Sequence, residues 1–250
     1  MSNVRSHTIS KSGSAGLRVG LLGGSFNPAH RGHLAMSLFA LRRLKLDQIW
    51  WLVSPQNPLK NRDEMLSFEN RIHKAKELVE RHNKIIVTDM ESKMKTCFTI
   101  DSLSAIKRRF SKTKFVWLMG QDNLKTIHLW KKWQSIFLEL PIAVFLRSGY
   151  SDSRTHSVAE TFFAKARLPL ALIEDLVKAA PPAWVVLDNR RVALSATQIR
   201  RRGKAGPGVN KPNEGVLTMA AKKKTAKKPV KKAVKKPAKK TAKKKTAKKK

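Results

Sequence analysis

The segment from Gly23 to His33 holds the residues of this chain that are best suited to phosphate chemistry. It joins a predicted strand to a predicted helix, so its backbone amides lie at a helix N-terminus, where anions bind. The paired glycines Gly23 and Gly24 allow a tight turn and a close approach of main-chain N–H groups to a ligand. His30 and His33, three positions apart, would project to one side and donate N–H groups to phosphate oxygens in a phosphoryl transition state. Taken singly, each feature also fits an ordinary turn or packed histidine.

The glycine pattern in this segment differs from those of two common nucleotide-binding folds. It is neither the Gly-x-Gly-x-x-Gly of NAD-binding Rossmann domains nor the Gly-x-x-x-x-Gly-Lys of P-loop proteins. Both classes are therefore disfavoured, and another mode of phosphate binding is indicated.

A second group of phosphate-binding candidates follows the last predicted strand. Ser195 and Thr197 are plausible N-caps of a helix, and Arg200 offers a fork-shaped pair of donors to phosphate. Read alone, this is a capped helix with a solvated arginine. A doubly wound sheet brings the first and last strand-to-helix turns near one crevice, so both groups could contact a single triphosphate.

A third group follows the predicted strand Phe115–Met119. Asp122, in Gly-Gln-Asp, supplies a carboxylate that can accept hydrogen bonds from a diol, and Trp130 supplies an aromatic face for a flat, electron-poor ring. The alternative is that Trp130 and Trp133 pack as core, an interpretation that suits Trp133 better.

Together these segments resemble the nucleotidylyltransferase superfamily, and within it the bacterial nicotinate mononucleotide adenylyltransferases. The resemblance runs from about Leu17 to Arg200. The first segment resembles G-G-x-F-D-P-x-H-x-G-H, with Asn27 in place of Asp, and the second resembles I-S-S-T-x-I-R, with Ala196 in place of Ser. The third resembles the branch's G-x-D and W-x-x-W elements. Thr96–Leu103 resembles the block T-x-(Y/F)-T-x-D-T-L, and Ser54–Lys60 resembles a proline-rich family loop.

The resemblance implies adenylyl transfer from ATP to nicotinate mononucleotide, giving deamido-NAD and pyrophosphate, with Mg²⁺ accompanying ATP and no dedicated protein metal site. Its implied catalytic residues are His30, His33 and Arg200. The implied ATP-binding residues are Gly23, Gly24, Ser25, Phe26, His30, His33, Ser195, Thr197 and Arg200, and the implied mononucleotide-binding residues are Thr99, Asp122, Trp130 and Lys60. A mobile surface loop is an equally good interpretation for Lys60.

The elements that must position these residues alternate between strands and helices. Apolar residues recur at helical spacing between short β-branched or aromatic runs, which predicts strands separated by crossover helices. The predicted strands are Leu17–Leu22, Ile49–Val53, Ile85–Thr88, Phe115–Met119, Ile142–Leu146 and Trp184–Leu187, and the predicted helical faces carry Leu34, Leu38 and Leu41, then Phe68, Ile72, Ala75 and Val79, then Ile100, Leu103 and Ile106. This pattern predicts an α/β fold with a Rossmann-like open parallel sheet and helices on both faces.

The formal net charge of +36 is spread unevenly along the 250 residues. Residues 222–250 contain 17 lysines in 29 residues and no acidic residue, which leaves +19 for residues 1–221. We expect a disordered N-terminus over 1–16, the nucleotidyltransferase domain over 17–202, a linker over 203–221 and a disordered Lys/Ala/Pro-rich tail over 222–250. Such charge predicts attraction to phosphate-bearing partners, including non-specific binding of nucleic acid by the tail.

Three further expectations follow from composition and motif content. Cys97 is the one cysteine, so no intrachain disulfide can form. No stretch approaches the ~20 apolar residues of a membrane span. Both observations favour a cytoplasmic protein. A pantetheine-phosphate adenylyltransferase shares the first and last motifs but lacks the G-x-D and W-x-x-W combination, and nicotinamide mononucleotide remains an alternative substrate. From a different class, the chain could be a nucleic-acid-associated protein acting through its basic tail.

Overall fold

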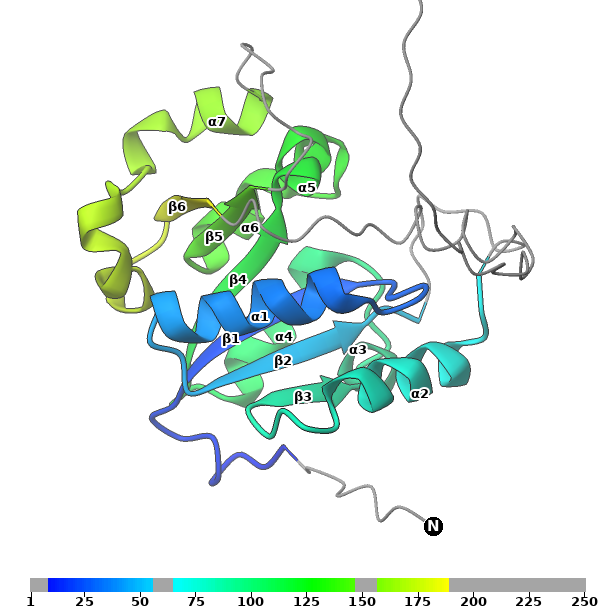
Figure 1. Cartoon of the computed structure of the whole chain (residues 1–250). Helices are drawn as coiled ribbons and strands as arrows, with labels where there is room; N and C mark the ends of the chain where they lie inside the picture. Colours follow the sequence, from blue (N-terminus) through cyan, green and yellow to red (C-terminus); the bar gives the residue numbers. More distant parts are fainter. Residues whose placement is uncertain (1–8, 56–64, 147–156, 189–250) are drawn as a thin grey trace, which may run out of the picture. The chain divides into compact units, whose positions relative to one another are not determined.

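The computed structural model describes residues 9–55, 65–146 and 157–188, all of which belong to the compact unit Met1–Pro207 (Figure 1). The elements are β1 (Arg18–Gly24), α1 (Arg31–Arg43), β2 (Gln48–Val53), α2 (Phe68–Val79), β3 (Ile85–Thr88), α3 (Met90–Lys93), α4 (Thr99–Arg109), β4 (Lys114–Gly120), α5 (Gln121–Thr126), η1 (Ile127–Leu129), α6 (Trp133–Glu139), β5 (Ile142–Leu146), α7 (Val158–Phe162), η2 (Ala164–Ala166), η3 (Leu170–Lys178) and β6 (Trp184–Asp188). The six strands form one sheet in the order β3-β2-β1-β4-β5-β6, and every pair is parallel. The predicted Rossmann-like fold is therefore confirmed.

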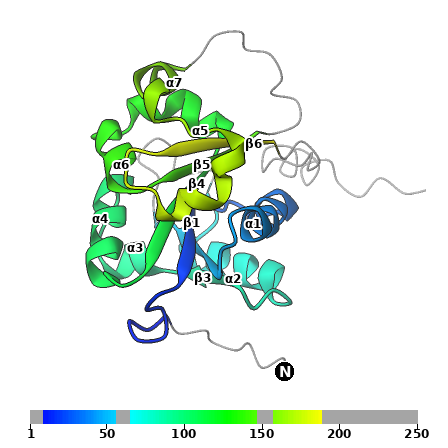
Figure 2. The ribbon, with the colours of Figure 1, turned by 90° about the vertical axis from the view of Figure 1, so that its left-hand side faces the viewer.

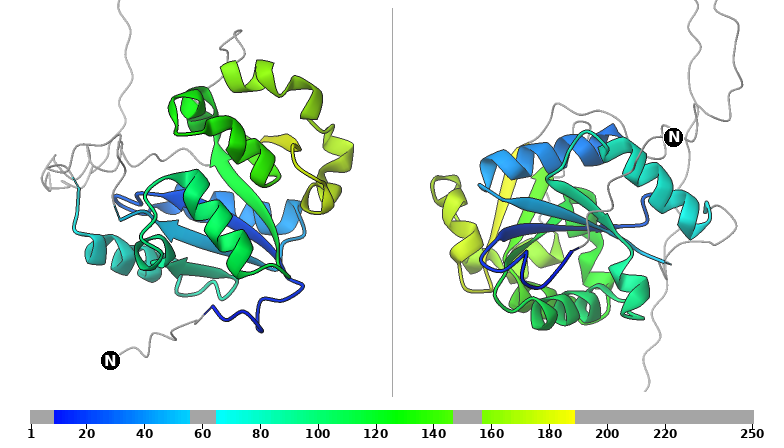
Figure 3. Two further views of the ribbon diagram at one scale, coloured as in Figure 1. Left: turned by 180° about the vertical axis from the view of Figure 1, so that it is seen from behind. Right: turned by 90° about the horizontal axis from the view of Figure 1, so that it is seen from below.

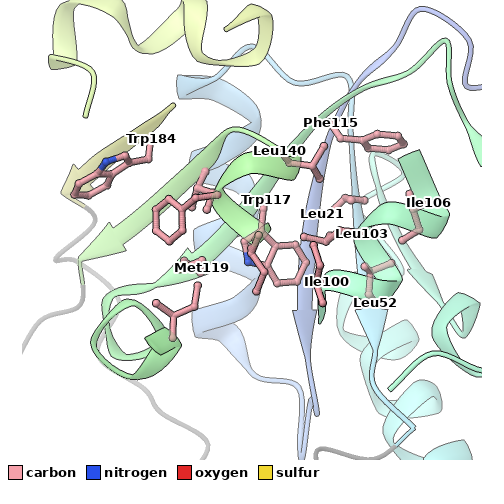
Figure 4. Packing of buried hydrophobic residues seen from close by; sticks show 14 of the residues in the cluster. Leu21, Leu52, Ile100, Leu103, Ile106, Phe115, Trp117, Met119, Leu140 and Trp184 are labelled. Carbon is pink, nitrogen blue, oxygen red and sulfur yellow. The ribbon is translucent and has the colours of Figure 1, made fainter. Parts of the chain in front are cut away.

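Helices cover both faces of this sheet, as the edge-on view in Figure 2 shows for α1 and α2 on one side and α4 and α6 on the other. Successive strand residues point to opposite faces, so Leu21 packs with α4 and α6 while Leu22 packs with α1. Figure 3, left, shows α4 lying across the sheet from behind. Figure 4 shows the α4 side of the core, where Ile100 and Leu103 meet Trp117. Burial on both faces explains why the strands read as continuous apolar runs.

All six predicted strands are present, but β1 continues two residues beyond its predicted end. Gly23 and Gly24 pair with Leu52 and Val53 of β2, so the glycine pair completes the strand. The chain leaves the extended conformation at Phe26, which has a φ of 44°. The tight turn expected at the glycines therefore begins at an aromatic residue.

The predicted helix after β1 is also present, although its most deeply buried residues are Met36, Ser37 and Ala40. The predicted face of Leu34, Leu38 and Leu41 is only partly buried and packs beside them. Small side chains at Ser37 and Ala40 let the helix axis approach the sheet, and the leucines fill the space to either side.

The first described residues form a turn, although the sequence predicts disorder over 1–16. Gly16 donates its N–H to the Lys112 carbonyl (2.8 Å), and Thr113 Oγ1 donates to the Ser14 carbonyl (2.7 Å). Ile9 packs against the core. This turn lies against the segment that leads into β4. Residues 1–8, like the linker and tail, lie outside the described residues.

We predict that Gly23→Ala destabilises the protein and that Gly24→Ala does so much less. A Cβ at Gly23 would overlap Cη2 of the buried Trp117 ring, whereas a Cβ at Gly24 would lie 3.6 Å from Phe26 Cε2, an ordinary contact. Overpacking of this kind costs about 1–3 kcal/mol. Urea unfolding of the two variants measures the difference, and equal losses would contradict this account of β1.

Candidate active site

The candidate site lies at the carboxyl edge of the sheet, where the strand order reverses between β1 and β4. In open α/β sheets the chain leaves such neighbouring strands toward opposite faces, and the opening between them binds ligands. The segment Ser25–His30 follows β1 and leads into α1, while Asp122 follows β4 in the first turn of α5. The topology thus brings the first and third predicted groups to one edge.

His30 and His33 are held by backbone hydrogen bonds at the start of α1. His30 is the N-cap, and its Nδ1 accepts the Gly32 N–H (3.0 Å), while His33 Nδ1 accepts the His30 N–H (3.3 Å). The two ring centroids are 3.9 Å apart. A ring nitrogen that accepts a hydrogen bond carries no proton, so these partners assign the proton of each neutral ring to Nε2. Each imidazole therefore has Nε2–H as its donor, as phosphate binding requires.

Aromatic packing supports this pair of histidines from below. The Phe26 ring is 2% exposed and stacks on Trp51 of β2 with centroids 4.9 Å apart, and it also lies 4.9 Å from the His33 ring. Trp51 Nε1 donates to Ser37 Oγ (2.9 Å), which donates to the His33 carbonyl (2.9 Å). The Phe26 ring thus packs the loop onto the core, and a role of Phe26 in ATP binding stays a prediction.

Thr99 and Trp130, two of the mononucleotide candidates, belong to the α4 side of the sheet. Thr99 is the first residue of α4, whose N-cap, Phe98, makes no side-chain capping bond, so the helix presents its first amides without a side-chain cap. Lys131 Nζ lies 4.2 Å from the Phe98 ring centroid and 3.4 Å from Asp101 Oδ2. Lys131 follows Trp130, so these contacts join the Trp130 segment to the start of α4.

The two tryptophans of the third group have different surroundings. Trp133 begins α6 and meets Phe137, Phe162 and Phe163 edge-on, with centroids 5.4 to 6.3 Å apart. Trp130 lies in the extended segment before α6, is partly buried, and makes no aromatic ring contact with the described residues. The core interpretation thus fits Trp133, and stacking of Trp130 on a ligand stays a prediction.

Comparison with known proteins agrees with this geometry. The cytidylyltransferase-like family model matches residues 21–202. A probable nicotinate-nucleotide adenylyltransferase of Cereibacter sphaeroides is 45% identical over 186 residues, 74% of this chain and 98% of its own length. Another of that name, from Erythrobacter litoralis, is 46% identical over 75% of this chain and 85% of its own length. The chain belongs to the nicotinate-nucleotide adenylyltransferase family.

Solved structures support the same fold for this adenylyltransferase family member. The nicotinic acid mononucleotide adenylyltransferase of Plasmodium falciparum, solved with NaAD, superposes with a TM-score of 0.56 at 17% identity. The match covers 74% of this chain and 83% of that one. At this identity the likeness supports the fold, and the residues of the site must be argued from this chain.

Four of the predicted site residues lie outside the described residues of this family member: Lys60, Ser195, Thr197 and Arg200. The convergence of the first and last phosphate-binding segments therefore stays a prediction. Within the described residues, no group of three or more His, Cys, Asp or Glu could hold a metal ion. In the same part of the chain, none of the helices combines the length and the apolar character that crossing a membrane would need.

Sequence reasoning missed two buried charged residues beside the site, Arg71 and Glu91. Arg71 lies under the loops that follow β1 and β2. Glu91 lies in α3, just before α4, and its own carbonyl accepts the Thr96 N–H (3.0 Å). Burial raises the pKa of the Glu91 carboxyl to about 7, and the Ser102 hydroxyl offsets only part of that rise. A Glu-containing four-residue helix gives no local signal of such burial.

We predict that stability falls as pH rises from about 4.5 to about 7, because the folded protein holds a proton on Glu91 that the unfolded chain has lost. The full penalty, present above pH 7, is about 3 kcal/mol. Glu91→Gln should flatten this dependence and raise the unfolding free energy at pH 8. Urea unfolding at pH 5 and pH 8 measures it, with exposed Glu80→Gln as control. An unchanged pH slope in Glu91→Gln would contradict the assignment.

Proposed function

We propose that this protein transfers the adenylyl group of ATP to nicotinate mononucleotide, forming deamido-NAD and pyrophosphate as a step of NAD biosynthesis. The observation that carries the proposal is the orientation of His30 and His33 by backbone N–H groups at the N-terminus of α1. Two Nε2–H donors and a helix N-terminus suit the negative charge that develops on a triphosphate during substitution. Gly23, Gly24 and Ser25 bring the backbone of the same loop to the phosphates.

In the proposed reaction, a phosphate oxygen of the mononucleotide attacks the α-phosphorus of ATP in line. The new bond joins that oxygen to phosphorus, the bond to the β-phosphate bridging oxygen breaks, and pyrophosphate leaves with its electron pair. No covalent enzyme intermediate is needed, so the protein contributes positioning and charge stabilisation. His30 and His33 serve this role together with Ser195, Thr197 and Arg200.

We further propose that Mg²⁺ enters as the ATP complex. Mg²⁺ retains several waters and is commonly held by substrate phosphates with few protein ligands. Its role is to offset charge on the triphosphate. His30 and His33 after β1 would then act as hydrogen-bond donors to the Mg²⁺-bound triphosphate, and no carboxylate ligand from the protein is needed.

The mononucleotide would bind on the β4 side of the crevice. Trp130, whose ring face carries no aromatic neighbour among the described residues, would stack on the pyridine ring. Asp122 would accept hydrogen bonds from the ribose diol, and the first amides of α4 at Thr99 would hold the nicotinate carboxylate. Lys60 would neutralise phosphate charge. A ring-stacking side chain beside a helix N-terminus favours a pyridine carboxylate over the flexible, uncharged pantetheine arm.

The proposal predicts dinucleotide formation from ATP, Mg²⁺ and nicotinate mononucleotide. It also predicts that a His33 variant loses kcat while it keeps its stability. His33→Asn keeps an acceptor at the Nδ1 position for the His30 amide but removes the Nε2 donor, so kcat should fall about 10²–10³-fold with little loss of stability. Exposed His73→Ala, on α2, is the control and should keep full activity. Chromatographic quantification of dinucleotide and pyrophosphate, with nicotinamide mononucleotide and phosphopantetheine in parallel, tests both points. Activity of His33→Asn equal to that of the unaltered protein would exclude the assigned role.

A second proposed property belongs to residues 222–250, which lie beyond the family match that ends at residue 202. Seventeen lysines without an acidic residue would bind nucleic acid or another polyanion through counterion release, without sequence preference. We place the protein in the cytoplasm, where ATP, mononucleotide and nucleic acid are all present.

Deletion of residues 222–250 should leave adenylyl transfer unchanged and abolish the salt-sensitive binding of duplex DNA. The binding constant of the full chain should fall steeply between 50 and 200 mM salt, as expected when several phosphate contacts release counterions. Fluorescence anisotropy with labelled DNA measures this binding. Loss of adenylyl transfer on deletion would instead assign the tail to the catalytic unit.

A further inference from the structure

We infer that Arg71 is a positioning residue for adenylyl transfer, because it fixes the peptide between Ser25 and Phe26 so that the Phe26 N–H faces away from the core. The inference rests on the proposed function for its kinetic consequences. Its structural content, the orientation of the loop after β1, is independent of that function.

Arg71 lies on α2 and is only 1% exposed, and its guanidinium donates to four backbone carbonyls. Nη1 donates to the Ser25 carbonyl (2.7 Å) and the Ser54 carbonyl (2.7 Å). Nη2 donates to the Pro55 carbonyl (2.8 Å), and Nε donates to the Leu66 carbonyl (3.2 Å). One planar group thus joins the loop after β1, the loop after β2 and the segment before α2.

This arrangement is unusual because no carboxylate among the described residues forms an ion pair with Arg71. Burial lowers the pKa of its guanidinium, and the charge of Glu69 opposes that shift only in part. A buried charge is costly, and an apolar side chain of similar volume often stabilises a core equally well. Packing alone therefore does not explain an arginine here. The property that only a guanidinium supplies is a rigid fork of donors that holds several carbonyls at once.

Of the four hydrogen bonds of Arg71, the one to the Ser25 carbonyl affects the segment proposed to bind ATP. In a planar trans peptide, C=O and the following N–H point in opposite directions, so a carbonyl directed at Arg71 turns the Phe26 N–H to the far side. The Phe26 N–H makes no hydrogen bond with any described residue. It stands between the glycines of β1 and His30, on the segment proposed to bind ATP. Arg71 would thereby orient the Phe26 N–H as a hydrogen-bond donor to the triphosphate without contacting the triphosphate itself.

A second hydrogen bond, between Leu66 and Asn27, holds the same loop in the same position. Asn27 Oδ1 accepts the Leu66 N–H (3.0 Å), while Arg71 holds the carbonyl of that residue. Leu66 is thus joined to the loop by the side chain of Asn27 and to the helix by Arg71. With both ties present, a rotation of the Ser25–Phe26 peptide would break a buried hydrogen bond, which is costly where no water replaces it.

The test compares Arg71→Met, Arg71→Lys and the control Val79→Ala in the full chain. Methionine keeps much of the volume without donors, lysine keeps the charge without the fork, and Val79 is a buried residue of the same helix, remote from the loops. Melting temperature, kcat and KM for each substrate are measured well below unfolding. Amide exchange of the peptide covering Ser25–Arg31 is followed by mass spectrometry without ligands.

We expect Arg71→Met to lower kcat/KM for ATP about 10²–10³-fold, the effect of losing one oriented donor. KM for the mononucleotide should change far less, Arg71→Lys should recover part of the loss, and exchange over Ser25–Arg31 should accelerate in both variants. Val79→Ala should lower the melting temperature with kcat and both KM values unchanged.

Two results would overturn the inference. One is a folded Arg71→Met or Arg71→Lys whose only change is a lower melting temperature, which would make Arg71 purely structural. The other is unchanged exchange over Ser25–Arg31. If Arg71→Met does not fold, Arg71→Lys decides between these outcomes. If the unaltered protein forms no dinucleotide, the proposed function fails, and the exchange measurement still tests the orientation of the loop.

Discussion

The position of β1 between two parallel neighbours is the constraint on which the site depends. Because all six strands are parallel, their carboxyl ends lie at one edge, and the order β3-β2-β1-β4-β5-β6 reverses direction between β1 and β4. The chain leaving β1 forms α1 on one face, whereas the chain leaving β4 forms α5 and α6, which share their core cluster with α4. His33 and Asp122 therefore reach the same edge from opposite layers. No local preference could bring them together without this topology.

The loop after β1 is strained, and its neighbours hold it in place. Phe26 has a φ of 44°, a left-handed conformation that costs about 1–2 kcal/mol for a residue with a Cβ. Stacking on Trp51 contributes about 0.5–1.5 kcal/mol beyond the burial of the ring. Two groups from outside the loop add hydrogen bonds: Arg71 donates to the Ser25 carbonyl, and the Leu66 N–H donates to Asn27 Oδ1. The conformation of the phosphate-binding segment is thus set by β2 and α2 as well as by its own residues.

The sequence predicts the strands well because their apolar runs record burial on both faces of the sheet. It predicts the turn at Gly23 and Gly24 wrongly. A glycine pair usually marks a turn, but here both glycines pair with β2, and Trp117 of the neighbouring strand β4 leaves no room for a Cβ at Gly23. Spacing alone also treats Trp130 and Trp133 alike, although only Trp133 packs among phenylalanines contributed by α6 and by α7 and its C-terminal end. These outcomes depend on partners far away in the sequence, which no local pattern contains.

Asn27, which stands where the family motif has Asp, is also explained by a partner far away in the sequence. The structure requires an oxygen acceptor there for the Leu66 N–H, and an amide supplies one as a carboxylate would. The difference is the charge: a carboxylate would place a negative group on the loop that is proposed to hold the triphosphate. Arg71 donates to the carbonyl of the same Leu66 and to three further backbone carbonyls, and no carboxylate of the described residues forms an ion pair with it. With an amide at position 27, the Leu66 N–H keeps its acceptor and the loop proposed to bind the triphosphate carries no negative charge there.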